Sequence, residues 1–587
     1  MSSESKVITA TSEVDIFHFD PAVKDLIEGD AAAKSYGEVS LKAFFTSFYV
    51  ILCSASAAIG GFLFGFDQGL ISIVLGMPQF LESFPEIDGT VNSSAAFNKG
   101  YEEPILALST TDNLSLMTAL LELGAAFGAL QSGYAADRIS RRYVLMLGTV
   151  WFIIGSTLQT SAFHFAQLVV GRFIGGVGIG TLACVAPLFI GEIAPPHLRG
   201  SMLVFESWMV CLGVVIAFYV TYATQYISGD WAYRLPFLIQ MIPGFVLAVM
   251  VLFMPFSPRW LCLRGRDTEA LHTLSKLRQL PITDARVQAE WILIRADIQS
   301  QNLAQALRHP SLANPETSSL RRELLSWMDC LRPGVFQRTI IGIGLQFFQQ
   351  FIGINAIIYY APTLFETLGM DRGTQLTYSG ITNVMQLVGV TPTFFLMDRV
   401  GRRPLLFAGS IICFACHIVT GSMVAKYHQD WPAHTTEARV GVAMLMIFMV
   451  TFGASWAPVP WAMPPEVCAS SYRSKSVALA VVSNWVNNFI IGLITPILVQ
   501  KTNGYGAFFF FAAFSAMSFF FVLFFVPETK GVSLEDMDAK FHSRTGTEDE
   551  ARRRSILNEI LHAAAGLGGA ATPEDSSDKM GAIAHVE

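Results

Sequence analysis

Charged residues are scarce in this chain, since Asp, Glu, Lys and Arg make up only 14% of its 587 residues. A soluble domain averages roughly 25% charged residues. Basic residues are not in excess either, because the formal net charge is -7, and so no nucleic-acid partner is predicted. Hydrophobic residues make up 52% of the chain and the mean hydropathy is +0.46, so most of the chain is predicted to lie in a lipid bilayer.

Signatures of catalysis and of bound metal or cofactor are also missing from the sequence. No nucleophile-base pair, phosphate-binding loop or cluster of metal ligands stands out. Cys413 and Cys416 form a C-x-x-C, but they lie in an apolar stretch without a second ligand pair, so we expect a structural role. The first forty residues have no short apolar core, which argues against a cleaved signal peptide. We therefore expect neither an enzyme nor a cofactor, metal or disulfide.

Long apolar stretches are what the sequence has instead. Twelve of them approach or exceed the roughly 20 residues that a helix needs to cross the hydrocarbon core. They form two sets of six, separated by a polar interval whose pattern predicts short amphipathic helices. The predicted fold is an all-α membrane protein with segments 1–44 (tail), 45–256 (first half), 257–337 (helical linker), 338–526 (second half) and 527–587 (tail).

The distribution of arginine predicts how the chain is oriented. Arginines concentrate in the loops after the second, sixth and eighth apolar stretches, and the positive-inside rule makes these loops cytoplasmic. An even number of helices then puts both tails in the cytoplasm and the loop 77–113 outside the cell. Two glycosylation sequons occur there, and we predict Asn92 rather than the membrane-proximal Asn113 as the modified residue.

Two short motifs occur once in each half of the chain. The six residues from Asp137 to Arg142 correspond to those from Asp398 to Arg403. A glutamate and an arginine seven residues apart also recur, as Glu192 with Arg199 and as Glu466 with Arg473. Such duplicated halves indicate a substrate site at the midplane between them and transport by alternating access.

Asp67 and Arg172 are the ionisable residues that we single out inside the predicted membrane helices. A charge at the centre of such a helix costs roughly 2.5 to 3.5 kcal/mol on insertion scales, so each invites a functional hypothesis. The arginine favours the charged carboxylate, whereas burial favours the protonated form, and the pair is therefore predicted to act as a proton switch. The alternative is a static salt bridge that orients helices.

Amide side chains line one face of the predicted helix 338–366. At helical spacing the shared face comprises Gln346, Gln349, Gln350, Asn355 and Tyr359. Amides both donate and accept hydrogen bonds without carrying charge, and therefore suit sugar hydroxyls. The alternative, hydrogen bonding between helices, accounts for one or two of these residues more easily than for all five.

The predicted helices 440–464 and 475–500 add aromatic and amide groups. Trp461 is the candidate platform on which the C–H face of a sugar ring stacks, with ordinary packing as the alternative. Asn484 and Asn488 follow on the next helix. Several prolines interrupt the helix that carries Trp461, and broken helices occur where transporters line a cavity.

With these residues in view, the chain resembles the sugar porter family of the major facilitator superfamily, and its fungal members most of all. The resemblance covers about residues 45–531. It rests on the helix-one run that ends at Asp67, both Asp-Arg loop motifs, Gly171-Arg172, Pro187 to Glu192 with Arg199-Gly200, Ser257 to Leu261, Gln349-Gln350 with Asn355, and Pro527 to Gly531.

The resemblance implies roles for individual residues. It implies that sugar contacts Gln349, Gln350, Asn355, Trp461 and Asn484, and the full expected set adds Phe64, Ser207, Tyr359, Asn383, Gln386 and Asn488. It supports Asp67 with Arg172 as the proton pair, although some facilitators of the family keep the aspartate. The implied cytoplasmic gate, called the gate set below, is Asp137, Arg138, Arg142, Glu192, Arg199, Asp398, Arg399, Arg402, Arg403, Glu466 and Arg473.

Three departures from the family pattern alter these expectations. Ser207, beside Glu206, stands where the family usually has a sugar-binding glutamine. Gln386 stands where the family has an asparagine, with Asn383 one turn earlier on the same face. Finally, Ser140 and Phe256 replace a glycine and a glutamate, which weakens the expected gate slightly.

The resulting functional expectation is a plasma-membrane importer of a monosaccharide, with hexose as the leading substrate and protons as the coupling ion. It is expected to act as a monomer in the lipid bilayer. The alternatives are a facilitator, or a porter of a pentose, disaccharide, polyol or quinate. A non-transporting sugar sensor is a further alternative, but it should need a long cytoplasmic extension, and residues 532–587 form a short one.

Overall fold

The computed structural model describes residues 22–28, 48–87, 110–195, 198–308, 325, 327–332, 335–468, 473–530 and 544–564. Within these ranges the chain is helical and contains no strand. The predicted glycosylation site Asn92 lies outside the described residues. The expectation of an all-α membrane protein is confirmed, because eleven helical stretches in the described part are long and apolar enough to span a membrane.

The first half contributes six of the membrane segments. Its helices are α3 (Phe48–Val74), α6 (Thr110–Ile139), α7 (Arg141–Thr160), α8 (Phe165–Ile193), α9 (Arg199–Thr224) and the pair α10 (Trp231–Ile239) and α11 (Met241–Phe253). The short α4 (Pro78–Ser83) follows α3. Although α6 is not among the eleven apolar stretches, it has 30 residues and packs among them against α8.

The second half contains six corresponding segments, three of which are broken. The continuous ones are α20 (Arg402–Tyr427), α23 (Arg473–Lys501) and α24 (Tyr505–Phe525). The broken ones are α16 (Phe336–Phe351) with α17 (Ile354–Glu366), α18 (Arg372–Val390) with α19 (Thr393–Val400), and α21 (Thr435–Ala454) with α22 (Val459–Val467).

Glycine and proline explain these breaks. Gly353 has φ 101°, a left-handed conformation that only glycine adopts without strain, and its missing Cβ makes room for the ring of Phe511. Pro392 and Pro458 are the N-cap residues that directly precede α19 and α22, and each lacks the N–H with which the preceding helix would continue. The stretch 338–366, predicted as one helix, therefore spans the membrane as two helices joined at Gly353.

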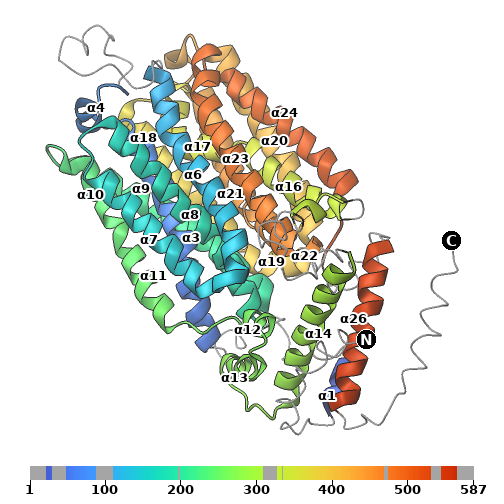
Figure 1. Ribbon diagram of the computed structural model, residues 1–587. Helices are drawn as coiled ribbons and strands as arrows, with labels where there is room; N and C mark the ends of the chain where they lie inside the picture. Colours follow the sequence, from blue (N-terminus) through green and yellow to red (C-terminus); the bar gives the residue numbers. More distant parts are fainter. Residues whose placement is uncertain are drawn as a thin grey trace.

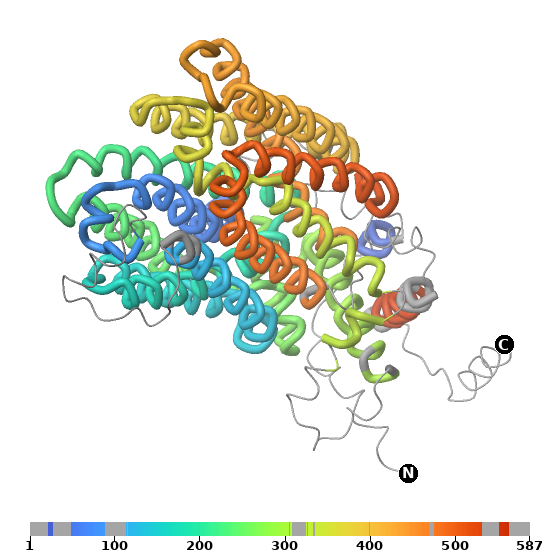
Figure 2. Tube along the Cα trace, turned by 90° about the horizontal axis from the view of Figure 1, so that it is seen from above, coloured from blue at the N-terminus to red at the C-terminus, as the bar shows by residue number. Residues whose placement is uncertain are grey.

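The two halves meet along a seam of three helix pairs, α6 with α23, α9 with α18, and α3 with α17. Figure 2 shows the helices coloured blue to green and those coloured yellow to red as two groups that meet there. Within the first half, small residues let helices approach closely. A side chain at Gly180 of α8 would collide with the backbone of Ala125 in α6, and one at Gly65 of α3 with that of Val210 in α9.

The linker helices lie together at one end of the membrane bundle (Figure 1). They are α12 (Pro258–Leu263), α13 (Asp267–Arg278) and α14 (Ala285–Arg308). Two helices from the tails, α1 (Ala22–Glu28) and α26 (Arg544–Ala564), both pack against α14. The described parts of the two tails and the linker are therefore on the same side of the bundle, called the linker side below.

The duplicated loop motif forms the same turn in each half. Ser140 precedes α7 with φ 95° and ψ 144°, and Gly401 precedes α20 with φ 106° and ψ 164°. This region strongly favours glycine, so Ser140 holds a strained conformation that Gly401 adopts freely. The hydroxyl of Ser140 is also buried without a hydrogen-bond partner among the described residues.

Replacing Ser140 with glycine is expected to stabilise the protein by about 1–3 kcal/mol, because it relieves backbone strain at this turn. Thermal unfolding of the purified protein in detergent measures the change. Gly401→Ser is the matched reverse variant and should destabilise, since a Cβ there would lie 2.6 Å from a carboxylate oxygen of Glu528. An unfolding temperature of Ser140→Gly below that of the unmodified protein would contradict the assignment of strain.

Candidate functional site

A polar cavity lies between the two halves, at the level of the helix breaks. It is lined from the first half by α3, α8 and α9, and from the second by α16, α17, α18, α21, α22, α23 and the turn between α21 and α22. Its polar lining residues are Gln68, Glu206, Ser207, Gln349, Gln350, Asn355, Gln386 and Asn484, and its aromatic ones are Phe64, Phe452 and Trp461. Because amides and aromatic rings dominate, the cavity suits an uncharged, polyhydroxylated ligand.

Most of the predicted sugar-binding residues come together in this cavity. Eight of them line it, namely Phe64, Ser207, Gln349, Gln350, Asn355, Gln386, Trp461 and Asn484. The other three, Tyr359, Asn383 and Asn488, are buried but are not part of the lining. The ring of Phe64 packs edge-on against that of Trp485, with centroids 4.9 Å apart, and so joins α3 to α23 across the seam.

Part of the amide face of α16 stabilises the broken helix beside it. Gln346 donates to the carbonyl of Pro460 at 2.9 Å, and Gln349 donates to that of Trp456 at 2.8 Å. Asn484 donates to both of these glutamines, at 2.6 and 2.7 Å. Carbonyls freed by the break between α21 and α22 are thus satisfied from within the protein. Hydrogen bonding between helices therefore accounts for Gln346 and Gln349, two of the five residues of this face.

The remaining amides bond with each other, and through Gln68 they connect the two halves across the seam. Gln350 accepts a hydrogen bond from Asn355 at 2.6 Å. Gln68 of α3 donates to the side chain of Asn355 at 3.3 Å and to the hydroxyl of Tyr359 at 2.9 Å. Gln68 was not among the residues predicted from the sequence, although its amide, directly after Asp67 in a membrane helix, could have indicated a cavity residue. These residues can exchange bonds with each other for bonds with a sugar.

Asp67 and Arg172 form the expected ion pair. An oxygen of Asp67 lies 2.7 Å from a terminal nitrogen of Arg172, and the two side chains are 1% and 2% exposed. The other oxygen of Asp67 is buried and has no partner among the described residues. The buried pair therefore keeps one carboxylate oxygen as a spare hydrogen-bond acceptor.

A second buried carboxylate, Glu122, lies near this pair and was not selected from the sequence. Its side chain is 1% exposed and accepts a hydrogen bond of 2.5 Å from the hydroxyl of Tyr359. Tyr359 in turn accepts bonds from Gln68 and from Asn488, the latter at 3.1 Å. An acidic residue in the middle of the predicted helix 114–136 was the signal that could have identified it.

Glu206 is a third buried carboxylate, and it faces the cavity itself. It is 4% exposed, and within the described residues it makes no hydrogen bond or ion pair. Gly61 of α3 makes room for it, since a Cβ there would lie 2.9 Å from a carboxylate oxygen. The hydroxyl of Ser207 beside it also has no described partner. This corner of the cavity therefore holds unpaired hydrogen-bonding groups.

The charged residues of the duplicated motifs form two similar clusters on the linker side. In the first half, Glu192 pairs with Arg141 at 2.9 Å and accepts a bond of 2.5 Å from Ser257. In the second half, Glu466 pairs with Arg402 at 2.8 Å and accepts a bond of 2.7 Å from Thr529. Each described cluster joins helices within one half rather than across the seam.

The remaining members of the gate set make different contacts. Asp137 pairs with Arg141, which was not predicted from the sequence and which also pairs with Glu192. Arg138 instead extends over the ring of Tyr134. Backbone carbonyls accept bonds from Arg142 and Arg403, and the carbonyl of Arg399 accepts one from Lys530. The side chains of Arg199, Asp398 and Arg473 lie outside the described ones.

The two clusters differ where Phe256 of the first half replaces the glutamate that the second half has as Glu528. Glu528 accepts hydrogen bonds from the backbone N–H groups of Arg402 and Arg403, both at 3.1 Å. At the corresponding place in the first half, Phe256 packs beneath the guanidinium of Arg142, 5.2 Å from its ring centroid. A cation–π contact thus stands where the second half has charge-assisted hydrogen bonds.

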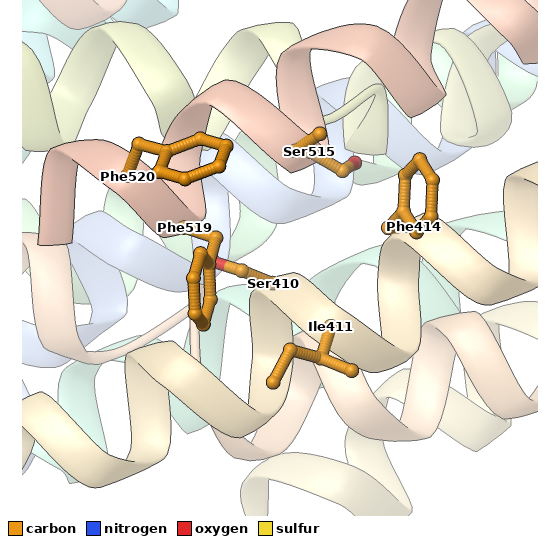
Figure 3. Close-up of a pocket in the computed structure, with 7 residues that line it drawn as sticks. Ser410, Ile411, Phe414, Ser515, Phe519 and Phe520 are labelled. Carbon is orange, nitrogen blue, oxygen red and sulfur yellow. The ribbon is translucent and has the colours of Figure 1, made fainter. Parts of the chain in front are cut away.

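A second crevice, between α20 and α24, does not have the chemistry of a sugar site. Figure 3 shows its lining by Ile411, Phe414, Phe519 and Phe520, with Ser410 and Ser515 between them. The two serine hydroxyls already make hydrogen bonds, to Ser518 and to the carbonyl of Phe511. No described polar group of this crevice is therefore free to bind a sugar.

The family model for sugar (and other) transporters matches residues 53–541. The chain belongs to this family. Its members are transporters and not enzymes. Sugar transport protein 8 of Arabidopsis thaliana is 32% identical over 83% of this chain and 90% of its own length. Hexose transporter 2 of Kluyveromyces lactis is 30% identical over 83% of this chain and 81% of its own length.

A high glucose sensor of Saccharomyces cerevisiae is also similar, with 31% identity over 84% of this chain, which spans 60% of the sensor's length. Among solved structures, the fold matches that of the proton:xylose symporter XylE bound to 6-bromo-6-deoxy-D-glucose. The TM-score is 0.67 at 24% identity, over 84% of this chain and 99% of that one. The expected major facilitator superfamily fold is thereby confirmed.

The hydrogen bonds of Asn484 provide a test of how the cavity wall is held. Asn484→Leu removes the donor shared by Gln346 and Gln349, and should lower the free energy of unfolding by about 1–3 kcal/mol for each acceptor left buried and unsatisfied. Asn383→Leu is the matched control, because the oxygen of Asn383 has no described partner to lose. Thermal unfolding in detergent should rank Asn484→Leu well below Asn383→Leu, and the reverse order would contradict this account.

Proposed function

We propose that this protein imports a hexose across the plasma membrane by alternating access, driven by protons, and that it acts as a monomer. The observation that carries the proposal is the amide-lined cavity at the seam, connected through Gln68 to the helix that bears Asp67. Sugar hydroxyls would replace the hydrogen bonds that Gln68, Gln350 and Asn355 make with each other. Trp461 would provide the flat surface on which the ring stacks.

The orientation in the membrane is also part of the proposal. Arginines cluster on the linker side, where the helices α1 and α26 of both tails pack against α14. The positive-inside rule makes this side cytoplasmic. The clusters around Glu192 and Glu466 would then stiffen the cytoplasmic ends of each half, so that the halves rock as units around the cavity.

Sugar-induced alkalinisation of the medium tests substrate and coupling together. Cells without their own hexose transporters, expressing this chain, should take up labelled glucose and raise the external pH as they do so. Asp67→Asn, which removes the negative charge of the buried pair, should abolish the alkalinisation. Uptake without any pH change would exclude proton coupling and leave a facilitator; no uptake of glucose, pentoses, disaccharides or polyols would exclude sugar import.

The unpaired carboxylate of Glu206 is expected to bind a sugar hydroxyl. Hydrogen bonds to charged groups contribute roughly 1.5–3 kcal/mol, so Glu206→Gln should raise KM for the sugar by about tenfold or more. The same change should let a sugar acid such as glucuronate compete with glucose, because the repelling charge is gone. Ser207→Ala is the control that keeps this charge. An unchanged KM in Glu206→Gln would show that this carboxylate does not contact the substrate.

A further inference from the structure

Glu122 stands out because neither the sugar cavity nor the proton pair accounts for it. It lies in the middle of α6, and its carboxylate is 1% exposed. Keeping such a charge at the centre of a membrane helix costs roughly 2.5–3.5 kcal/mol on insertion scales. One of its oxygens has no hydrogen-bond partner among the described residues. A group that is costly to bury and incompletely paired calls for a functional explanation.

Glu122 and Asp67 share a single arginine. The guanidinium of Arg172 acts on the carboxylates of both Asp67 and Glu122, and it is in direct contact with Asp67 at 2.7 Å. Two ionised carboxylates and one arginine leave a surplus negative charge in a buried site. One bound proton makes the group neutral, and interacting carboxylates share such a proton as a unit.

Apart from Arg172, the helices packed around Glu122 bring no positive charge among the described residues. Arg172 comes from α8 and Asp67 from α3, while α17 contributes Tyr359, which donates to the carboxylate. From α23 the nearby group is the uncharged amide of Asn488. The neighbouring Tyr360 instead bonds with Thr118, one turn before Glu122, at 2.9 Å. The charge on Glu122 therefore depends mainly on Arg172 and on the proton.

Tyr359 connects this carboxylate to the cavity. A hydroxyl has one proton to give and two lone pairs. The proton of Tyr359 goes to Glu122, and its lone pairs accept bonds from Gln68 and Asn488. Gln68 lines the cavity and also donates to Asn355, another lining residue. All the bonds of Tyr359 are thus engaged, and a change at Glu122 must alter how firmly Gln68 and Asn355 are held.

We propose that Glu122 is a second proton-binding carboxylate of this transporter, and that the hydroxyl of Tyr359 couples its protonation to occupancy of the sugar cavity. The inference rests on the proposed sugar/proton import. A proton from the outside binds the carboxylate of Glu122, crosses the membrane together with the sugar, and is released to the inside. The O–H bond of the protonated carboxyl is the only covalent bond that forms and breaks.

The strength of hydrogen bonds gives the direction of the coupling. Bonds to an ionised acceptor are roughly twice as strong as neutral ones. Protonating Glu122 weakens its bond from Tyr359, which releases Gln68 and Asn355 to turn toward sugar hydroxyls. Sugar should therefore bind more tightly at lower external pH. Coupling of this kind typically changes affinity by roughly 5–150-fold.

Glu122→Gln tests the inference, because glutamine still accepts a bond from Tyr359 but cannot bind a proton. In transporter-null cells, the unmodified protein should show a glucose KM at least about fivefold lower at pH 5 than at pH 7. In Glu122→Gln the KM should stay at the low-pH value throughout, uphill accumulation and alkalinisation should be lost, and sugar exchange between the two sides should continue. Thr118→Val, on the same helix beside Tyr360, should keep the pH dependence.

Other outcomes separate this inference from the proposed function. Unchanged accumulation and pH dependence in Glu122→Gln would overturn the inference and leave proton-driven import standing. Glucose uptake without alkalinisation by the unmodified protein would overturn both.

A second measurement applies if Glu122→Gln does not fold. Calorimetric titration of the purified protein with glucose, in buffers of different ionisation enthalpy, counts the protons taken up on sugar binding. The uptake should be lost in Tyr359→Phe, which keeps both carboxylates but removes the hydroxyl that connects Glu122 to Gln68; uptake equal to that of the unmodified protein would overturn the inference.

Discussion

Polar groups inside a bilayer must find their partners within the protein, and this constraint governs the structure around the seam. A break in a membrane helix exposes carbonyls that water cannot reach. Near the break between α21 and α22, Gln346 and Gln349 donate hydrogen bonds to backbone carbonyls. Both glutamines in turn accept hydrogen bonds from Asn484. The break is what places Trp461 at the cavity, so the amides that satisfy the backbone also shape the site.

The same constraint acts on the cavity and on the buried charges beside it. Buried polar side chains must bind each other. Asn355 bonds with Gln350 within the second half, and Gln68 bonds across the seam with Asn355 and with the hydroxyl of Tyr359. A sugar can replace these bonds because its hydroxyls both donate and accept. The carboxylates of Asp67 and Glu122 lie behind this layer and around one arginine. A short series of hydrogen bonds, through Gln68 and Tyr359, therefore connects the cavity lining to the carboxylate of Glu122.

The duplicated halves have similar charged clusters on the linker side, but they differ in their broken helices and in their buried ion pair. Glu192 and Glu466 each pair with the fifth residue of the loop motif and accept a bond from a hydroxyl in the chain that follows the sixth segment. The broken helices that surround the cavity belong mostly to the second half, whereas the buried ion pair belongs to the first. Most of the amides that line the cavity thus belong to the second half, whereas Asp67, Arg172 and Glu122 belong to the first.

The sequence by itself determined the membrane class, the two sets of six helices, the family and most of the polar and aromatic residues that line the cavity, because apolar length and motif spacing are local properties of the chain. It also indicated the pair Asp67 and Arg172, since isolated charges in apolar stretches need partners. Only the tertiary structure decided which amides hold helices together and which face the cavity, because that depends on the rotation of each helix and on the turn at Gly353. It likewise brought Glu122, Gln68 and Tyr359, distant in sequence, within hydrogen-bond reach.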